Sequence, residues 1–235
     1  MVNLNFLEFD ESRDFPYYNN NPQLSKTAWF ILLLMLPVSF LLYSIVGLVS
    51  DFVGSIVFCF SLLIPLLYFS NWDYSLMFHK PTRNEIILAF LMFCGYLLYF
   101  IIVGTVLDYF ALSGATTSAS LDYVNVDSFL GLIFSMMGEE LVKFIPLMFF
   151  IRFIYKYSGN KRLSVIISSV IVLIGFGFLH YLPPENTVIS VLLLQGFGSV
   201  FEVYGYVKTK NLFVPYLSHF FTDALIFALI LLGFS

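Results

Sequence analysis

Seven ionisable side chains lie in stretches of this sequence that are otherwise apolar enough to cross a membrane. A charge at the centre of a bilayer costs about 3 kcal/mol on insertion scales, so such residues are rare there and usually serve a function. All of them fall in the C-terminal half of the chain, which predicts a buried polar site built from its last four apolar segments. They are Glu139, Glu140, Lys143, His180, Glu202, His219 and Asp223.

The spacing of these residues places several of them on shared helix faces. Glu140 and Lys143 are three residues apart and Glu139 and Lys143 are four apart, so the lysine can pair with either carboxylate across one helical turn. His219 and Asp223, in the segment HFFTD, are also four apart and share a face.

Carboxylates and imidazoles in one buried site suit the activation of water. A carboxylate in a low-dielectric pocket can take a proton from water and act as a general base. Imidazoles can polarise a carbonyl, shuttle protons or bind a metal, and a partner such as Asp223 fixes their tautomer. Glu140, His180 and His219 could also hold zinc with an open position for water. Either arrangement points to hydrolysis of a peptide bond.

Structural roles compete with this interpretation for each residue taken alone. A glutamate near a lysine inside a span is often a packing salt bridge. His180 precedes Tyr181 and two prolines, a context typical of a hydrogen-bonded residue at the membrane interface. Glu202, six residues before Lys208, is interpreted as lying close to the lipid headgroups. Packing does not explain so many ionisable groups on neighbouring segments, because burying them costs free energy.

The composition indicates an integral membrane protein. Of the 235 residues, 60% are hydrophobic and only 11% are charged, and the mean hydropathy is +0.90. A soluble domain of this length is far less apolar. Runs long enough to cross about 30 Å of hydrocarbon as helices are predicted near residues 28–50, 52–70, 86–107, 128–151, 163–182, 187–207 and 213–234. The predicted fold is therefore all-α, a polytopic transmembrane helix bundle of about seven spans.

The predicted organisation has three parts: a polar tail at 1–27, transmembrane helices with an outer loop at 28–127, and the site-bearing transmembrane core at 128–235. Every Lys and Arg except Lys143 lies in the tail or in loops on one side of the predicted spans. The positive-inside rule therefore predicts a cytoplasmic N-terminus and an external C-terminus. Cys59 and Cys94 lie in apolar spans and predict no disulfide.

Three segments resemble motifs of the CPBP group of intramembrane proteases, named for type II CAAX prenyl endopeptidases and bacteriocin-processing proteins and also called the Abi family. The paired glutamates with a basic residue are seen as EELVK, FxxxH as FGFLH, and HxxxN or HxxxD as HFFTD. The resemblance covers about residues 128–230. It implies that Glu139 or Glu140 activates water with His180 assisting, while His219 and Asp223 stabilise the oxyanion or orient the substrate.

The chain departs from the family pattern in its first motif. The family places Arg four residues after the second glutamate, where this chain has Phe144, and the cation here is Lys143. That spacing and Asp223 are similar to the PrsW-like branch, whose members cleave anti-sigma factors, whereas His180 is typical of the main family. Lys143 and Phe176, which lies one turn before His180, are expected to support the site.

The resemblance implies a membrane lipid environment and a peptide or protein substrate, either lipidated or the precursor of a secreted peptide. No basic patch with interleaved aromatic residues indicates a nucleic-acid partner. Both a metalloprotease with zinc at Glu140, His180 and His219 and a metal-independent glutamate protease are compatible with the residues, and we expect no tightly bound metal. The expected location is a microbial plasma membrane.

Two other functions stay open. The first is a catalytically silent scaffold or immunity protein of the same family. The second is a proton-coupled transporter that uses Glu139, Glu140 and Asp223 as relays, although the sequence shows no inverted repeat of the kind found in transporters.

Helical rise raises one difficulty for the expected site. At 1.5 Å per residue from the cytoplasmic edge, His219 lies about 13 Å deep, Glu139 near the middle and His180 about 27 Å deep. Groups of one site should share a depth. Helix tilt, a late start of the span at 163–182 or a break in the last span near Pro215 brings His180 to the others, or His180 is not part of the site.

Overall fold

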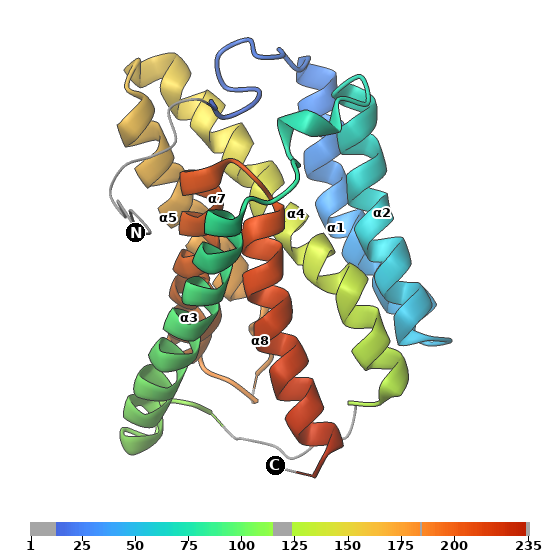
Figure 1. The fold of residues 1–235 in the computed structure, drawn as a ribbon, viewed down its shortest axis with the longest axis vertical. Helices are drawn as coiled ribbons and strands as arrows, with labels where there is room; N and C mark the ends of the chain where they lie inside the picture. Colours follow the sequence, from blue (N-terminus) through green and yellow to red (C-terminus); the bar gives the residue numbers. More distant parts are fainter. Residues whose placement is uncertain (1–12, 115–123, 184, 234–235) are drawn as a thin grey trace.

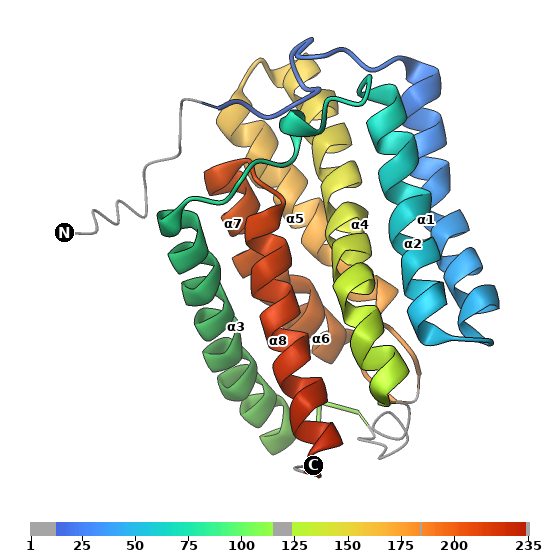
Figure 2. The ribbon, with the colours of Figure 1, turned by 45° about the vertical axis from the view of Figure 1, so that its right-hand side comes forward.

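The computed structural model describes residues 13–114, 124–183 and 185–233, which form an all-helical bundle without a β-strand (Figures 1 and 2). The long helices are α1 (Lys26–Gly47), α2 (Asp51–Phe69), α3 (Arg83–Tyr109), α4 (Val126–Ser158), α5 (Lys161–Leu179) and α8 (Phe213–Leu231). An irregular segment joins α5 to α8. It consists of α6 (Val188–Val191), a π-helical turn η3 (Leu192–Gly196), a 3-10 turn η4 (Phe197–Ser199) and α7 (Val200–Thr209), and a further 3-10 turn, η1 (Tyr74–Leu76), precedes α3.

Within the described residues, six helical segments are long and apolar enough to cross a membrane: α1, α2, α3, α5, the irregular segment Val188–Thr209, and α8. The remaining predicted span, 128–151, lies inside α4, a helix of 33 residues that is about 50 Å long. It is not one of the six because Glu139, Glu140 and Lys143 interrupt its apolar sequence. The prediction of an all-α polytopic membrane bundle is confirmed.

α4 runs through the middle of the bundle and makes more contacts with the other elements than any other helix does. The pair α1 and α2 packs on one side of it, α5 on another, and α8 on a third (Figure 1). α3 packs against α7 and α8 rather than against α1 and α2 (Figure 2). Side chains of α4 therefore face those of α7 and α8, which positions the two last helices over the carboxylates of α4.

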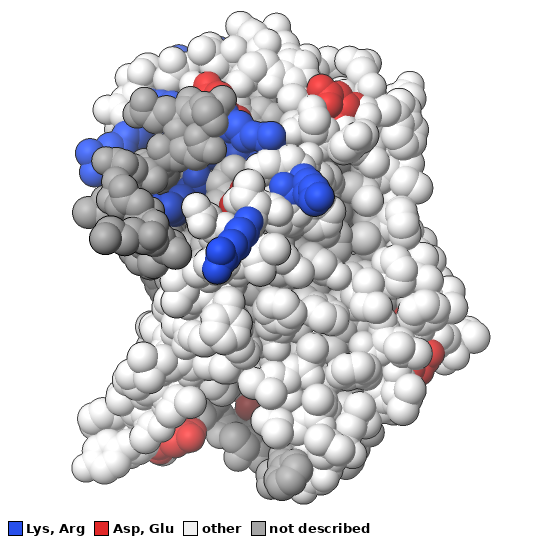
Figure 3. All heavy atoms as spheres, viewed as in Figure 1, with Lys and Arg blue, Asp and Glu red and all other residues white. Residues whose placement is uncertain are grey.

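The two ends of the bundle carry opposite charge. One end, called the basic end here, holds the starts of α1, α3, α5 and α8 and all described Lys and Arg residues except Lys143. The other, called the acidic end, is formed by the α1–α2 turn, the start of α4 and the ends of α3 and α5. It carries Asp51, Asp108, Asp127 and Glu185 but no described Lys or Arg. On the face in Figure 3, the Lys and Arg residues lie in the upper half, together with some Asp and Glu. The charged residues visible in the lower half are all Asp or Glu.

Residues 13–25 lie across the basic end and pack into the core. They form no helix or strand, as their composition indicates, but their apolar side chains Phe15, Tyr17, Tyr18 and Leu24 are buried. The Tyr17 hydroxyl hydrogen-bonds with Ser70 Oγ at 2.6 Å, and the Tyr17 carbonyl accepts a bond of 3.0 Å from Arg152. Burial raises the pKa of Tyr17 to about 12. The polar composition of the segment gave no sign of this packing.

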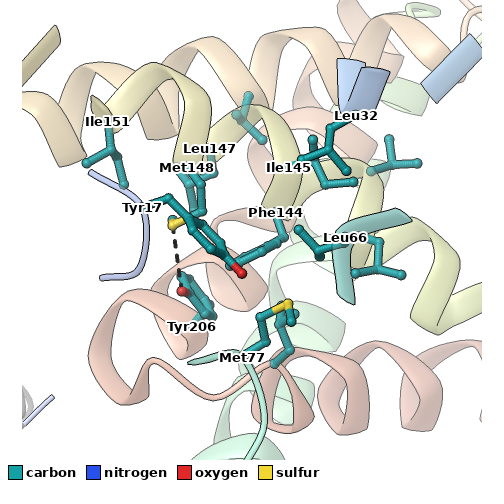
Figure 4. Close-up of a cluster of buried hydrophobic side chains, with 14 of the residues drawn as sticks. Tyr17, Leu32, Leu66, Met77, Phe144, Ile145, Leu147, Met148, Ile151 and Tyr206 are labelled. Atoms are coloured by element: carbon teal, nitrogen blue, oxygen red, sulfur yellow. Dashed lines mark hydrogen bonds between the residues drawn. The ribbon is translucent and has the colours of Figure 1, made fainter. Parts of the chain in front are cut away.

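The apolar core lies beside the second half of α4 (Figure 4). Phe144, Ile145, Leu147, Met148 and Ile151 of α4 are all almost completely buried. The ring of Phe144 packs edge-to-face on Tyr206 of α7 with centroids 5.2 Å apart, and the Tyr206 hydroxyl donates to Met148 Sδ at 3.8 Å. These contacts fix α7 against α4 one turn beyond the ionisable residues.

Candidate active site

A buried ammonium group bridges two carboxylates at the centre of the bundle. Nζ of Lys143 lies 2.6 Å from Oε1 of Glu140, one turn earlier on α4, and 2.7 Å from Oε2 of Glu202 on α7. Each of the three side chains is 3% exposed. An unpaired charge at such a position costs several kcal/mol, so each of the three groups makes the burial of the others tolerable.

Glu202 joins this cluster from the irregular segment before α8. Its helix starts after the π-helical and 3-10 turns, an irregularity that is frequent at functional sites. Close approach to the neighbouring helices requires glycine here. A Cβ on Gly196 would lie 2.8 Å from the carbonyl oxygen of Leu173, and one on Gly198 would lie 2.8 Å from the ring of Tyr96. The interpretation that Glu202 lies near the headgroups is corrected, because Glu202 is buried against Lys143.

His219 of α8 links the buried cluster to two more accessible carboxylates. Its Nδ1 lies 2.8 Å from Oε1 of Glu140, while its Nε2 lies 3.8 Å from Glu139 Oε2 and 3.9 Å from Asp223 Oδ2. The exposed fraction rises from 3% for Glu140 to 12% for His219, 23% for Glu139 and 29% for Asp223. Separations near 4 Å exceed a hydrogen bond and are of the length that a water molecule can bridge.

His180 lies outside this cluster. It is the C-cap residue of α5, where its Nδ1 lies 3.0 Å from the carbonyl oxygen of Phe176 and its ring packs on the Phe176 ring with centroids 4.8 Å apart. In the described parts of the chain it makes no hydrogen bond or ion pair with Glu139, Glu140 or His219. The structure therefore does not pair His180 with the glutamates or with His219, and among the predicted site residues it contacts Phe176.

The position of His180 at the C-terminal end of α5 accounts for this result. His180 follows the last turn of α5 at the acidic end, and α8 is continuous from Phe213 to Leu231 without a break at Pro215. Phe176 contacts the cluster instead, because its ring lies 4.6 Å from Nζ of Lys143 and provides a cation–π contact. The expected supporting roles of Lys143 and Phe176 thus rest on direct contacts with the cluster, whereas His180 contacts Phe176 and none of the carboxylates.

A metal site does not fit these residues. The predicted zinc set of Glu140, His180 and His219 is not assembled, because His180 stays at the end of α5. Ligand atoms of Glu140, Glu202 and His219 do lie within 4.8 Å of one another. However, the ammonium of Lys143 contacts both of these carboxylates, and a divalent cation there would face a fixed positive charge at short range.

Phe144 occupies the position where the family with similar motifs has arginine. Its side chain is 2% exposed and packs on Tyr206, so it faces the apolar core and not the carboxylates. Lys143 supplies the positive charge beside Glu140. The basic residue of the first motif thus lies one position earlier than the arginine of the family pattern, and its ammonium group still contacts Glu140, the second glutamate of the pair.

Residues 124–225 match the family model described as type II CAAX prenyl endopeptidase Rce1-like. The matched range contains all three motifs and every residue of the cluster, and it confirms the resemblance inferred from EELVK, FGFLH and HFFTD. The comparisons with curated proteins and with solved structures found no match.

Proposed function

We propose that this chain is an intramembrane endopeptidase in which Glu139 activates water, because residues 124–225 match the Rce1-like type II CAAX prenyl endopeptidase family model. The family supports intramembrane peptide hydrolysis in general. The observation that carries the assignment to Glu139 is the position of Nε2 of His219, which lies within 4 Å of both Glu139 and Asp223 at the accessible side of the cluster.

The two adjacent glutamates have different surroundings, which supports different roles. Glu140 is 3% exposed and already shares its carboxylate with Lys143 and His219. Glu139 is 23% exposed and has no Lys or Arg within salt-bridge distance among the described residues. A general base needs a free lone pair within reach of water. Glu139 meets this requirement, and Glu140 acts as a positioning residue that orients His219.

The contact with Glu140 sets which nitrogen of His219 faces the substrate. Nδ1–H donates to the carboxylate of Glu140, so Nε2 points towards Glu139 and Asp223. In the proposed reaction, water loses a proton to Glu139 as its oxygen attacks the peptide carbonyl. His219, when protonated at Nε2, donates to the oxyanion, and the proton on Glu139 passes to the departing amine as the C–N bond breaks. Asp223 orients the imidazole or the substrate amide.

Cleavage of a quenched peptide library by purified protein in detergent tests this proposal. We expect Glu139→Gln and His219→Ala to lower the rate by about 10²- to 10⁴-fold, the usual contribution of acid–base catalysis. Asp108→Asn, which makes the same kind of change as Glu139→Gln at an exposed position of the acidic end, serves as the matched control. A strong chelator is expected to leave the rate unchanged, because the Lys143 ammonium lies between the two buried carboxylates.

Other results would redirect the assignment. A Glu139→Gln variant as active as wild type, together with an inactive Glu140→Gln variant, would move the general base to Glu140. A folded wild-type protein that cleaves no peptide would favour the silent scaffold, and Phe144→Arg would then be the first variant to assay for gain of activity.

A further inference from the structure

Glu202 of α7 is the one ionisable residue of the cluster that lies outside the motifs EELVK, FGFLH and HFFTD. Its side chain is 3% exposed, and its Oε2 accepts a hydrogen bond of 2.7 Å from Nζ of Lys143. Ligand atoms of Glu202 and His219 lie within 4.8 Å of each other, but the two side chains form no ion pair. Any effect of Glu202 on His219 therefore passes through the residues between them.

The ammonium group of Lys143 does not need Glu202 for its neutralisation. Oε1 of Glu140 lies 2.6 Å from Nζ, and a spacing of three residues brings such a pair together in any helix. One ammonium neutralises one carboxylate, so the second carboxylate adds a negative charge at a buried position, where charge is costly. Packing alone does not account for this cost, because an apolar side chain at position 202 would fill the space without it.

The backbone that brings Glu202 to Lys143 is irregular and is fixed by a neighbouring helix. The π-helical turn η3 and the 3-10 turn η4 directly precede α7, and such turns are frequent at functional sites. The hydroxyl of Tyr99 on α3 donates a hydrogen bond of 2.8 Å to the carbonyl oxygen of Leu193 within η3. A second element thus holds the segment that positions Glu202.

The contacts of Glu140 indicate what the second carboxylate does. Nζ of Lys143 and Nδ1 of His219 lie 2.6 and 2.8 Å from the same oxygen, Oε1 of Glu140. These two donors share one acceptor. Glu202 binds the ammonium from another side, so Glu140 does not carry its charge alone and stays available to the imidazole. The Phe176 ring, 4.6 Å from Nζ, provides a third partner for the three donors of the ammonium.

We propose that Glu202 is a positioning residue of the reaction and acts on His219 through Lys143 and Glu140. By holding the ammonium, it keeps the Glu140 carboxylate directed at Nδ1 of His219, which leaves Nε2 facing Glu139 and the substrate carbonyl. Glu202 touches no reacting atom itself. The inference rests on the proposed endopeptidase function and adds to it the residue that sets the orientation of the histidine.

The state of His219 can be measured without turnover by nitrogen NMR of protein labelled with the nitrogen-15 isotope in histidine only. The chain has three histidines, so His219→Ala assigns the signals of that ring. Glu202→Gln keeps the size of the side chain and removes its charge. It should shift the Nδ1 and Nε2 signals of His219, which report tautomer and hydrogen bonding, and leave those of His79 at the basic end in place.

Val203→Ala is the matched control for this measurement, because it removes a buried apolar side chain from the same helix without changing a charge. It should leave the His219 signals unchanged. His219 signals that do not move in Glu202→Gln, or that move equally in Val203→Ala, would overturn the proposal. This result is decisive even if no peptide is cleaved and the proposed function fails.

In the peptide assay, Glu202→Gln should lower kcat by about 10- to 100-fold, the size of effect found for groups that orient metal-binding histidines. KM should change little, because Glu202 is buried away from the substrate. Glu202→Asp, which keeps the charge, should lose less, and Val203→Ala should keep kcat near that of wild type. A Glu202→Gln variant with wild-type kcat, beside an inactive Glu139→Gln, would refute the positioning role and leave the proposed general base in place.

A double-mutant cycle tests the route through Lys143. Glu202→Gln should lower kcat in the wild-type background and cause no further loss in the Lys143→Met background, where no ammonium remains to be held. The four proteins are compared below the lowest of their Tm values, so that each is folded. Equal factors in the two backgrounds would show that Glu202 acts by another route, and the proposal would fail.

Discussion

Replacing Lys143 with methionine removes the ammonium group from the buried cluster and keeps a side chain of similar length. Glu140 and Glu202, whose side chains are each 3% exposed, would then face each other without their shared cation. Their nearest carboxylate oxygens lie within 4.8 Å. The low dielectric of this position makes the repulsion and the lost pairing costly.

The magnitude follows from the burial of all three groups. Removing one partner of a buried ion pair costs about 3–5 kcal/mol, because the remaining charge is left without compensation. At about 2–4 °C per kcal/mol for a chain of this size, the Tm of Lys143→Met should fall by roughly 6–20 °C. Adding Glu140→Gln and Glu202→Gln removes both carboxylate charges, so the triple variant should recover much of this loss.

Thermal unfolding in detergent, followed by circular dichroism at constant pH and salt, measures these shifts. Lys156→Met is the matched control, because Lys156 is exposed at the basic end and a surface charge contributes only about 0–1 kcal/mol. A Tm for Lys143→Met within about 2 °C of wild type would mean that the carboxylates are not left uncompensated, and the account of the cluster as a mutually stabilised buried group would fail.

Two further predictions test packing and the composition of the site. Gly138→Ala should destabilise the protein by about 1–3 kcal/mol and lower its Tm, because the added Cβ would lie 2.4 Å from the Phe58 ring. The control Gly104→Ala places its Cβ where nothing lies within 4 Å, so it should be neutral or slightly stabilising. Equal Tm shifts for the two variants would show that α2 and α4 are not in close contact at Gly138. In the peptide assay, His180→Ala should retain far more activity than His219→Ala, because only His219 contacts the glutamates; an equal loss would return His180 to the site.

The helices could be located from the sequence because membrane insertion demands long apolar runs. The predicted spans 52–70 and 163–182 correspond to α2 (Asp51–Phe69) and α5 (Lys161–Leu179). α4 extends to Ser158, beyond the predicted end at 151. Its last turns carry Arg152 and Lys156, cations that interrupt an apolar run but favour the C-terminal end of a helix.

The candidate site was only partly predictable. The pair of Glu140 and Lys143 follows from a spacing of three residues, which any helix brings together. Glu202 lies 59 residues further along and meets Lys143 only because α7 packs beside α4. A signal was present, since Glu202 sits in a span without a cation one turn away, but its partner was not specified. The position of His180 at the end of α5, away from the glutamates, could not be predicted because a motif gives order along the chain and not distance in the fold.

The sequence by itself determined that the chain is an all-helical membrane protein and which ionisable groups it buries, because hydropathy and helical periodicity are local properties. The tertiary structure decided which carboxylates share the ammonium of Lys143 and which remain accessible. The reason is physical: in a low-dielectric interior, the chemistry of a charged group depends on its nearest partner. For Glu202 and His219 that partner comes from a different helix, and helix packing sets the distance.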